Sequence, residues 1–111
     1  MNAARIDPHV FDELQANAGA EFVLELVDTF VEEAPRLLAE LRSALTTGAA
    51  ERFRRAAHSL KSNSSTFGAS RLATMARALE QAGMPPNSDP LDTLAGEIEL
   101  TLTALRHLAR Q

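Results

Sequence analysis

The sequence predicts an all-α protein: an antiparallel up-down four-helix bundle with a short additional N-terminal helix. Apolar residues recur at helical spacing along most of the 111-residue chain, and no segment shows the strict alternation of a strand. Glycines and prolines fall mainly between the periodic segments, where they predict short connections. Short loops make consecutive amphipathic helices antiparallel neighbours, so the helices should pack as one bundle. A chain of this length fits a single domain, residues 1–111.

The dipeptide Asp7-Pro8 marks the start of the first helix. An aspartate at the N-cap accepts hydrogen bonds from free backbone N–H groups, and a proline at the first helical position has no N–H to lose. We expect a short helix from there to about Asn17, ended by Gly19. Its inward residues are Val10, Phe11 and Leu14.

The longest periodic pattern covers about residues 20–46 and is closed by Gly48. Its apolar residues recur at helical spacing: Phe22, Val23, Leu26, Val27, Phe30, Ala34, Leu37, Leu38, Leu41 and Leu45. Pro35 lies inside this pattern. Because proline removes one helical hydrogen bond and clashes with the preceding turn, we expect a kink or a short break there.

A third helix is predicted at about residues 50–67, and Gly68 is the residue that ends it. Its inward stripe consists of Phe53, Ala56, Ala57, Leu60, Ser64 and Phe67, with Ser64 as a small packing residue. A fourth helix follows at about 70–82, ended by Gly83. Its inward residues are Leu72, Met75, Leu79 and Ala82.

Residues 84–88 predict a loop, and Asp89-Pro90 repeats the pairing of an N-cap with a first-position proline. The last helix should therefore cover about 90–109. It carries two heptad rows: Leu91, Ile98 and Leu105, then Leu94, Thr101 and Leu108. Leu100 falls off this face and is expected to be exposed.

Composition and charge exclude several classes of protein. The chain has no cysteine, which excludes disulfides and thiolate metal sites. It has no apolar run near the ~20 residues of a membrane span and no apolar leader, so we expect a cytoplasmic protein without membrane insertion. The net charge of −4 argues against nucleic-acid binding. His9 and His107 are expected to be structural or neutral. His9 with Glu13 is too weak a pattern for a metal site, so none is predicted.

The charge is unevenly distributed. Residues 1–40 carry nine carboxylates and two arginines, whereas residues 51–61 carry four cations and one carboxylate. At ~100° per residue, His58 lies about 160° from Leu60 and about 140° from Phe53, so it points away from the inward stripe. The residues within about 60° of His58 are Glu51, Arg54, Arg55, Lys61, Ser62 and Ser65.

An exposed histidine in this setting suits the acceptance of a phosphoryl group. Histidine titrates close to neutral pH, so an exposed imidazole is in large part neutral and nucleophilic in the cell. Neighbouring cations favour the neutral ring and attract a phosphoryl group. A carboxylate next to the ring would oppose this, and on this face of the helix the sequence offers only Glu51, two turns away. The small serines keep the surface low, so that the active site of a second protein can approach.

The residues around His58 carry a resemblance to a known family. The run Ala57-His58-Ser59-Leu60-Lys61, with Gly68 ten residues after the histidine and Leu79-Glu80 later, resembles the histidine-containing phosphotransfer (HPt) domain of two-component phosphorelays. The upstream segment 30–41 resembles the family's segment before the active helix. The resemblance covers about residues 6–83, and the last helix matches only as an amphipathic helix.

The resemblance implies a role for each matched position. His58 would be the phosphoacceptor, and Lys61 would orient or neutralise the phosphoryl group. Gly68 would end the active helix and keep the docking surface clear. Ser62 stands where the family most often has glycine, and its hydroxyl could either bond the phosphoryl oxygens or slightly obstruct the partner. Supporting positions on the same face are Arg54, Arg55, Ser62 and Ser65.

The resemblance also implies partners. These are response-regulator receiver domains, whose aspartates exchange the phosphoryl group with His58, and a sensor histidine kinase, including the hybrid kind. The receiver would supply Mg²⁺, and this chain would bind no cofactor. It has no Gly-rich phosphate loop, so no autonomous kinase activity is expected. We expect a monomer, with docking through apolar side chains of the 20–46 helix near Pro35.

Three other interpretations remain open at the level of sequence. The chain could be a helical adaptor that binds or sequesters a receiver domain without being phosphorylated. It could be a dimeric helical kinase core, although no nucleotide-binding domain accompanies it. His58 could be an ordinary solvated surface histidine. The retention of His58 together with Lys61 favours phosphotransfer over these alternatives.

Overall fold

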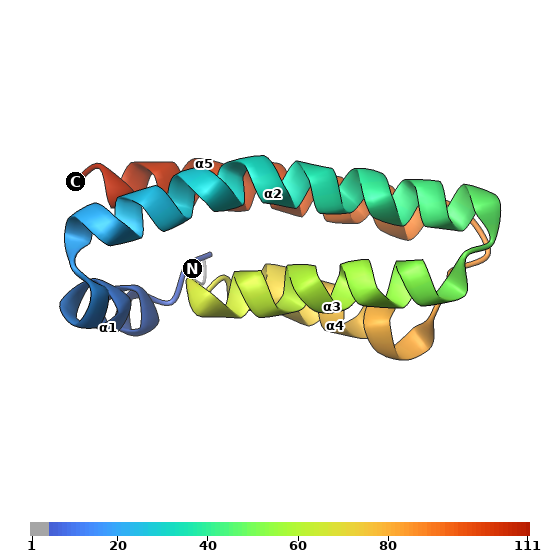
Figure 1. Ribbon diagram of the computed structural model, residues 1–111, viewed down its shortest axis with the longest axis horizontal. Coiled ribbons are helices and arrows are strands. Elements are labelled where there is room, and N and C mark those ends of the chain that lie inside the picture. Colours follow the sequence, from blue (N-terminus) through green and yellow to red (C-terminus); the bar gives the residue numbers. More distant parts are fainter. Residues whose placement is uncertain (1–4) are drawn as a thin grey trace.

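The computed structural model describes residues 5–111, which form five α-helices and no strand. The helices are α1 (Pro8–Ala18), α2 (Ala20–Thr47), α3 (Ala50–Thr66), α4 (Ser70–Ala82) and α5 (Asp89–Ala109). Consecutive long helices run in opposite directions, so the predicted up-down bundle is confirmed (Figure 1). No helix in the described part of the chain is long and apolar enough to span a membrane.

The four long helices form a ring in which each packs against two others. Helix α2 contacts α3 and α5, and α4 contacts the same two helices. Figure 1 shows α2 and α5 as one layer and α3 and α4 as the other, with the short helix α1 at one end of the bundle. At 1.5 Å per residue, the 28 residues of α2 extend about 42 Å. This helix therefore sets the long dimension of the molecule.

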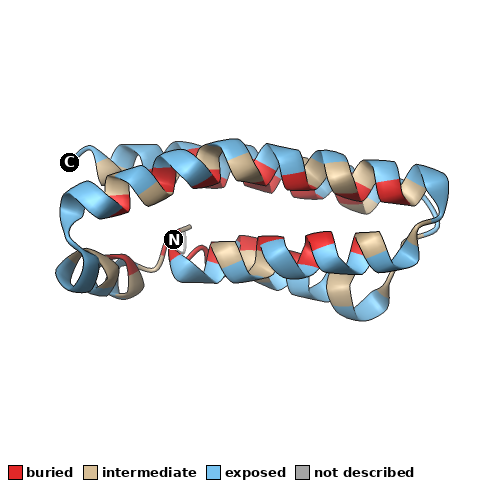
Figure 2. Ribbon diagram, viewed as in Figure 1, coloured by how far each residue is buried: buried red, intermediate tan, exposed pale blue. Residues whose placement is uncertain are grey.

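The core lies between the two layers, where the buried faces meet (Figure 2). All six predicted inward residues of α3 are buried, including Ser64. In α5, five of the six predicted heptad positions are buried, and Leu100 is exposed as expected. The prediction of an inward position is wrong for two residues: Phe22 is 52% exposed, and Ala82 is exposed at the end of α4. Each lies in the first or last turn of its helix, where no neighbouring helix covers it.

Helix α2 continues through Pro35 without the short break that the sequence allowed. Figure 1 shows the helix bending about its middle. Pro35 lies in the central part of Ala20–Thr47. Ala34 and Leu37, on either side of the proline, are buried in the core. Packing of these turns against α3 and α5 offsets the missing hydrogen bond, because tertiary contacts contribute more to helix stability than propensity does.

Two helix starts differ in how they are capped. Asp7 caps α1 as predicted, since its Oδ1 accepts a hydrogen bond from His9 N at 2.9 Å. Asp89 is not the N-cap of α5. Ser88 occupies that position without a side-chain bond, and Asn87 Oδ1 accepts from Asp89 N at 2.9 Å. The side chain of Asn87, two residues before Asp89, therefore makes the turn at the start of the helix that the aspartate was expected to make.

The segment before α1 is tied to the bundle at two points. Asp7 N donates to the carbonyl of Gly68 at 2.8 Å, which joins the segment to the end of α3. The guanidinium of Arg5 donates to both carboxylate oxygens of Glu97 on α5, at 3.0 and 3.2 Å. Glu97 is almost fully buried, and Thr101 also donates to it. A buried carboxylate requires such partners, because burial without them is costly.

Candidate functional site

Helix α3 presents His58 on its outer surface and anchors it from behind. The side chain of His58 is 53% exposed, whereas the adjacent Ala57 and the nearby Leu60 are fully buried. The helical period places the inward and outward residues on opposite sides of one rigid helix. The imidazole ring is therefore displayed on the surface of a helix whose other side is packed into the core.

The turn between α3 and α4 decides which residues face His58. Gly68, at φ +74°, ends α3 in the left-handed conformation, as predicted for the residue after the helix. The two helices then run antiparallel, with the hairpin centred on about residue 69. A residue some eleven positions before this centre lies level with one the same distance after it. His58 is therefore level with Glu80, and Lys61 is level with Arg77.

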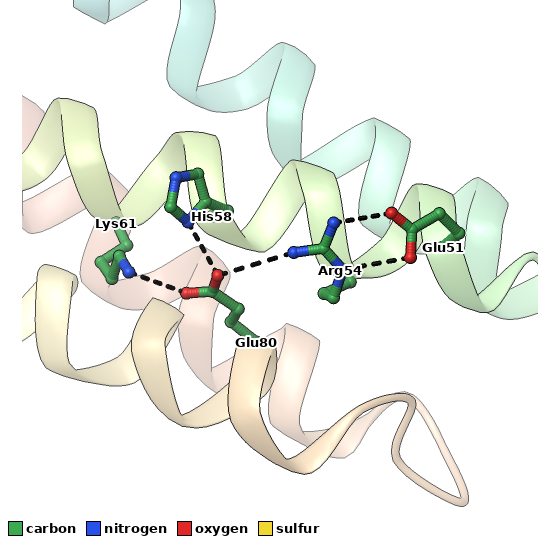
Figure 3. A network of polar contacts seen from close by, with 5 residues as sticks. All are labelled: Glu51, Arg54, His58, Lys61 and Glu80. Atoms are coloured by element: carbon green, nitrogen blue, oxygen red, sulfur yellow. Dashed lines mark hydrogen bonds and ion pairs between the residues drawn. The ribbon is translucent and has the colours of Figure 1, made fainter.

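Glu80 lies at the centre of a polar network around His58 (Figure 3). Its Oε2 lies 2.7 Å from His58 Nδ1, and its Oε1 lies 2.9 Å from Lys61 Nζ. Arg54 Nη1 lies 3.9 Å from Oε2. The expectation that no acid stands beside the histidine is therefore wrong. The sequence of α3 alone could not reveal this carboxylate, because α4 supplies it.

The contacts of Glu80 determine which nitrogen of the histidine is free. The Lys61 ammonium and then the His58 ring, both hydrogen-bonded to Glu80, hold the pKa of that carboxyl below its usual value. Glu80 is therefore an ionised carboxylate, which can only accept hydrogen bonds. In the neutral imidazole, this contact places the proton on Nδ1 of His58 and leaves the lone pair on Nε2. In Figure 3 the second ring nitrogen points away from Glu80.

Among the predicted site residues, the structure brings His58, Lys61 and Arg54 together around Glu80. Arg54 is held mainly by Glu51, through bonds of 2.6 and 3.1 Å. Arg55 is exposed, and no carboxylate of residues 5–111 lies within 4.0 Å of it. Ser62 and Ser65 are also exposed and lie outside this network. The exposed serines make the surface near His58 polar.

Gly68 has a different neighbour from the one expected. It is buried, and a Cβ at this position would lie 2.8 Å from Val10 Cβ and 3.1 Å from the Asp7 carbonyl oxygen. The missing side chain therefore makes room for the chain's own N-terminal segment. The glycine ends α3 as predicted. The space beside it was expected to stay clear for a docking partner, but α1 and the residue before α1 occupy it.

Two surface depressions of unlike chemistry flank α3. On the α2 side lies a hollow of about 280 Å³ lined by Leu26, Thr29, Phe30, Glu33, Asn63, Thr66 and Phe67, which we call the apolar hollow. On the α4 side lies a groove of about 270 Å³ lined by Lys61, Ser65, Ser70, Ala73, Thr74 and Arg77, which we call the basic groove. Pro35 adjoins neither, because it faces α5 on the other side of α2.

Glu80 and Arg77 are the residues near the site to which reasoning from the sequence gave no role. The signal that identifies them is the position of Gly68. Reflecting residues 58 and 61 through the centre of the α3–α4 hairpin leads to residues 80 and 77. Within residues 5–111, no group of three or more histidine, aspartate or glutamate side chains is placed to hold a metal ion.

Comparisons with known proteins agree with the geometry. Residues 25–108 match the family model of the Hpt domain. No curated protein matches the chain. Among solved structures, the crystal structure of histidine-containing phosphotransfer protein B (HptB) from Pseudomonas aeruginosa PAO1 is similar, with 32% sequence identity and a TM-score of 0.77. That match covers 99% of this chain and 95% of the other. The chain is an all-helical bundle with an exposed histidine, and the family model matches most of its length. It therefore belongs to the Hpt domain family of histidine phosphotransfer domains.

Proposed function

We propose that the chain relays a phosphoryl group between aspartates of response-regulator receiver domains, with Nε2 of His58 as the acceptor atom. One observation carries this proposal. The histidine is exposed, and its Nδ1 is held by a carboxylate at 2.7 Å, so the free nitrogen is the one that solvent and partner can reach. A sensor histidine kinase, including the hybrid kind, would supply the phosphoryl group to the first receiver.

When a receiver donates the phosphoryl group, the lone pair of Nε2 attacks the phosphorus of its phosphoaspartate. The bond from phosphorus to the aspartate oxygen breaks, and the aspartate leaves as a carboxylate. The imidazole, which keeps its proton on Nδ1, gains positive charge as the new bond forms. Glu80 faces that proton and stabilises this charge, as an acid does in a hydrolase triad. A carboxylate on Nδ1 therefore favours transfer, whereas one beside Nε2 would repel the incoming phosphoryl group.

Lys61 is the cation best placed to contact the phosphoryl oxygens. Its ammonium has three donors, and Glu80 occupies one of them at 2.9 Å. The remaining donors can neutralise charge on a phosphoryl group bound to Nε2, one helical turn away. Arg54 adds positive charge on the other side of the ring, while Glu51 holds its guanidinium in place. Lys61 and Arg54 would thus flank the group being transferred.

The partner would dock over the exposed ring and against α2. The apolar hollow offers the partly exposed Leu26 as a contact, with the buried Phe30 and Phe67 in its lining, and the exposed Phe22 lies one turn before Leu26. The receiver would bring the acceptor aspartate and Mg²⁺. In this role, residues 1–111 would be one domain that acts as a monomer in the cytoplasm.

Phosphoryl transfer from purified phosphorylated receiver domains tests the proposal. Wild-type protein should gain an acid-labile, alkali-stable label, as phosphohistidine does, and His58→Gln should gain none. The matched control is His107→Gln, since His107 is exposed on the last turn of α5 and should label like the wild type. Unchanged labelling of His58→Gln would refute the assignment. Receiver binding without transfer to the wild type would instead support the adaptor.

A further inference from the structure

The basic groove adjoins the phosphoacceptor, yet the transfer chemistry does not use most of it. Of its six lining residues, two are cations, three carry hydroxyls, one contributes a methyl group and none is a carboxylate. Lys61 belongs both to this groove and to the network around Glu80. The groove is therefore continuous with the site, and it extends along α3 and α4 toward the hairpin turn.

Arg77 gives the groove a positive charge that the protein does not neutralise. It is exposed, and no carboxylate of the described residues lies within 4.0 Å of its guanidinium. Glu80, one turn further along α4, is engaged by Lys61, His58 and Arg54 instead. Since the other groove cation, Lys61, already has an anionic partner, Arg77 is the groove residue whose five N–H donors are available.

The charge of this region is opposite to that of the rest of the chain. Residues 50–82 carry six lysines and arginines but only two glutamates. The rest of the sequence carries five lysines and arginines and thirteen aspartates and glutamates. An acidic protein that confines a basic surface to the helices around His58 attracts a negatively charged partner to that surface. The groove is the part of this surface where hydroxyl groups accompany the cations.

We propose that the basic groove receives an acidic side chain of the receiver domain that exchanges the phosphoryl group with His58, and that Arg77 is the residue that selects for it. This inference rests on the proposed function. Arg77 would bind the carboxylate with two parallel hydrogen bonds, and Ser65 and Thr74 would donate the remainder. With the apolar hollow on the opposite side of α3, the ring lies between two flanks of unlike chemistry. A partner with one apolar and one acidic contact can then dock in only one orientation.

The test uses the full chain with two charge reversals that change the net charge equally. Arg77→Glu alters the groove. Arg106→Glu is the matched control, because Arg106 is exposed on α5 and also has no carboxylate partner within 4.0 Å among residues 5–111. Two reactions are measured for each protein. One is direct phosphorylation of His58 by phosphoramidate, in which the P–N bond breaks and ammonia leaves. The other is transfer from a purified phosphorylated receiver.

Arg77→Glu should lower kcat/KM for transfer from the receiver by about 10-fold, while Arg106→Glu should change it less than about 2-fold. Both should react with phosphoramidate like the wild type. The deficit of Arg77→Glu should shrink as salt rises toward 1 M, where the screening length falls to about 3 Å. Arg77→Lys should recover part of the rate, because it restores the charge but not the paired geometry.

Equal transfer rates for the two reversals would overturn the inference while leaving the phosphotransfer role intact. Failure of the wild type to react with phosphoramidate and with every receiver would instead refute the proposed function itself. A titration with inorganic phosphate provides the other check. Saturable amide shifts at Ser65 and Thr74, with receiver transfer unaffected by Arg77→Glu, would identify a site for small anions and overturn the docking inference.

Discussion

The Nδ1 atom of His58 on α3 lies 2.7 Å from Oε2 of Glu80 on α4, although 22 positions separate the two residues in the chain. In the neutral imidazole, this contact places the proton on Nδ1 and leaves the lone pair on Nε2. It also places a negative charge where the imidazole would become positive in the proposed transfer. The same carboxylate binds Lys61 at 2.9 Å, so one residue contacts both the proposed nucleophile and the cation beside it.

Removal of Glu80 should change the tautomer of His58. In the wild type at neutral pH, the ¹⁵N spectrum should show a protonated Nδ1 and an unprotonated Nε2. In Glu80→Ala the two neutral tautomers should mix, and transfer from a receiver should slow by about 10- to 100-fold, because the charge-assisted hydrogen bond to the imidazole is lost. The tautomer separates this role from a merely structural one, since loss of packing alone would not move it.

Glu51→Ala is the control for that experiment, because Glu51 contacts Arg54 but not the histidine. It should leave the tautomer of His58 as in the wild type. A mixture of tautomers in both variants would show that the general charge of this face, rather than the bond from Glu80, sets the proton position.

The contribution of Glu80 to stability should depend on pH. Its pKa is lowered in the folded protein, first by Lys61 and then by His58. A lowered pKa means that the contribution is fully present above the unfolded value of about 4.3 and is lost as pH falls through the folded value. The difference in unfolding free energy between wild type and Glu80→Gln should therefore be constant near neutrality and shrink in acid. Urea unfolding from pH 7 to pH 3 measures it, and a difference that grows in acid would contradict the network.

Gly68→Ala should destabilise the protein by about 2–4 kcal/mol, combining the left-handed backbone with overpacking. The overpacking arises because the new methyl group would meet Val10 Cβ at 2.8 Å. Gly48 is a matched control, since its φ is +72° but nothing lies within 4 Å of an added Cβ. Gly48→Ala should cost about 1 kcal/mol. Thermal or urea unfolding measures the stability of both variants. Equal losses of stability would show that α1 moves aside at no measurable energetic cost.

Ser64→Ala should stabilise the protein. Ser64 is fully buried, and its Oγ has no hydrogen-bond partner among residues 5–111. Replacing an unpaired buried hydroxyl by a methyl group removes a desolvation cost, so we expect a gain of about 1 kcal/mol and a rise of about 4 °C in Tm. Ser59→Ala, on the exposed side of the same helix, reports helix propensity alone. A loss of stability in Ser64→Ala beyond that of Ser59→Ala would show that the hydroxyl has a partner.

Much of the fold follows from local patterns in the sequence. The helical period identified every long helix to within about two residues. The buried face of a helix appears in the sequence as apolar residues that recur every three to four positions. Asp7 caps α1 and Gly68 ends α3, as their local chemistry predicts. The errors lie where packing decides: Phe22 and Ala82 belong to the apolar pattern but no neighbour covers them, and α2 continues through Pro35 because its flanking turns are buried.

The sequence by itself determined that His58 is an exposed histidine on a basic, serine-rich helix face, since these properties follow from the period of a single helix. Only the tertiary structure decided that Glu80 bonds its Nδ1, that Arg77 stands level with Lys61, and that Gly68 is covered by the segment before α1. Each of these relationships joins residues from different helices. Their contact depends on how the α3–α4 hairpin turns and how the helices pack. The apolar pattern of one helix fixes which of its own residues share a face, but it does not fix which residues of a neighbouring helix lie beside them.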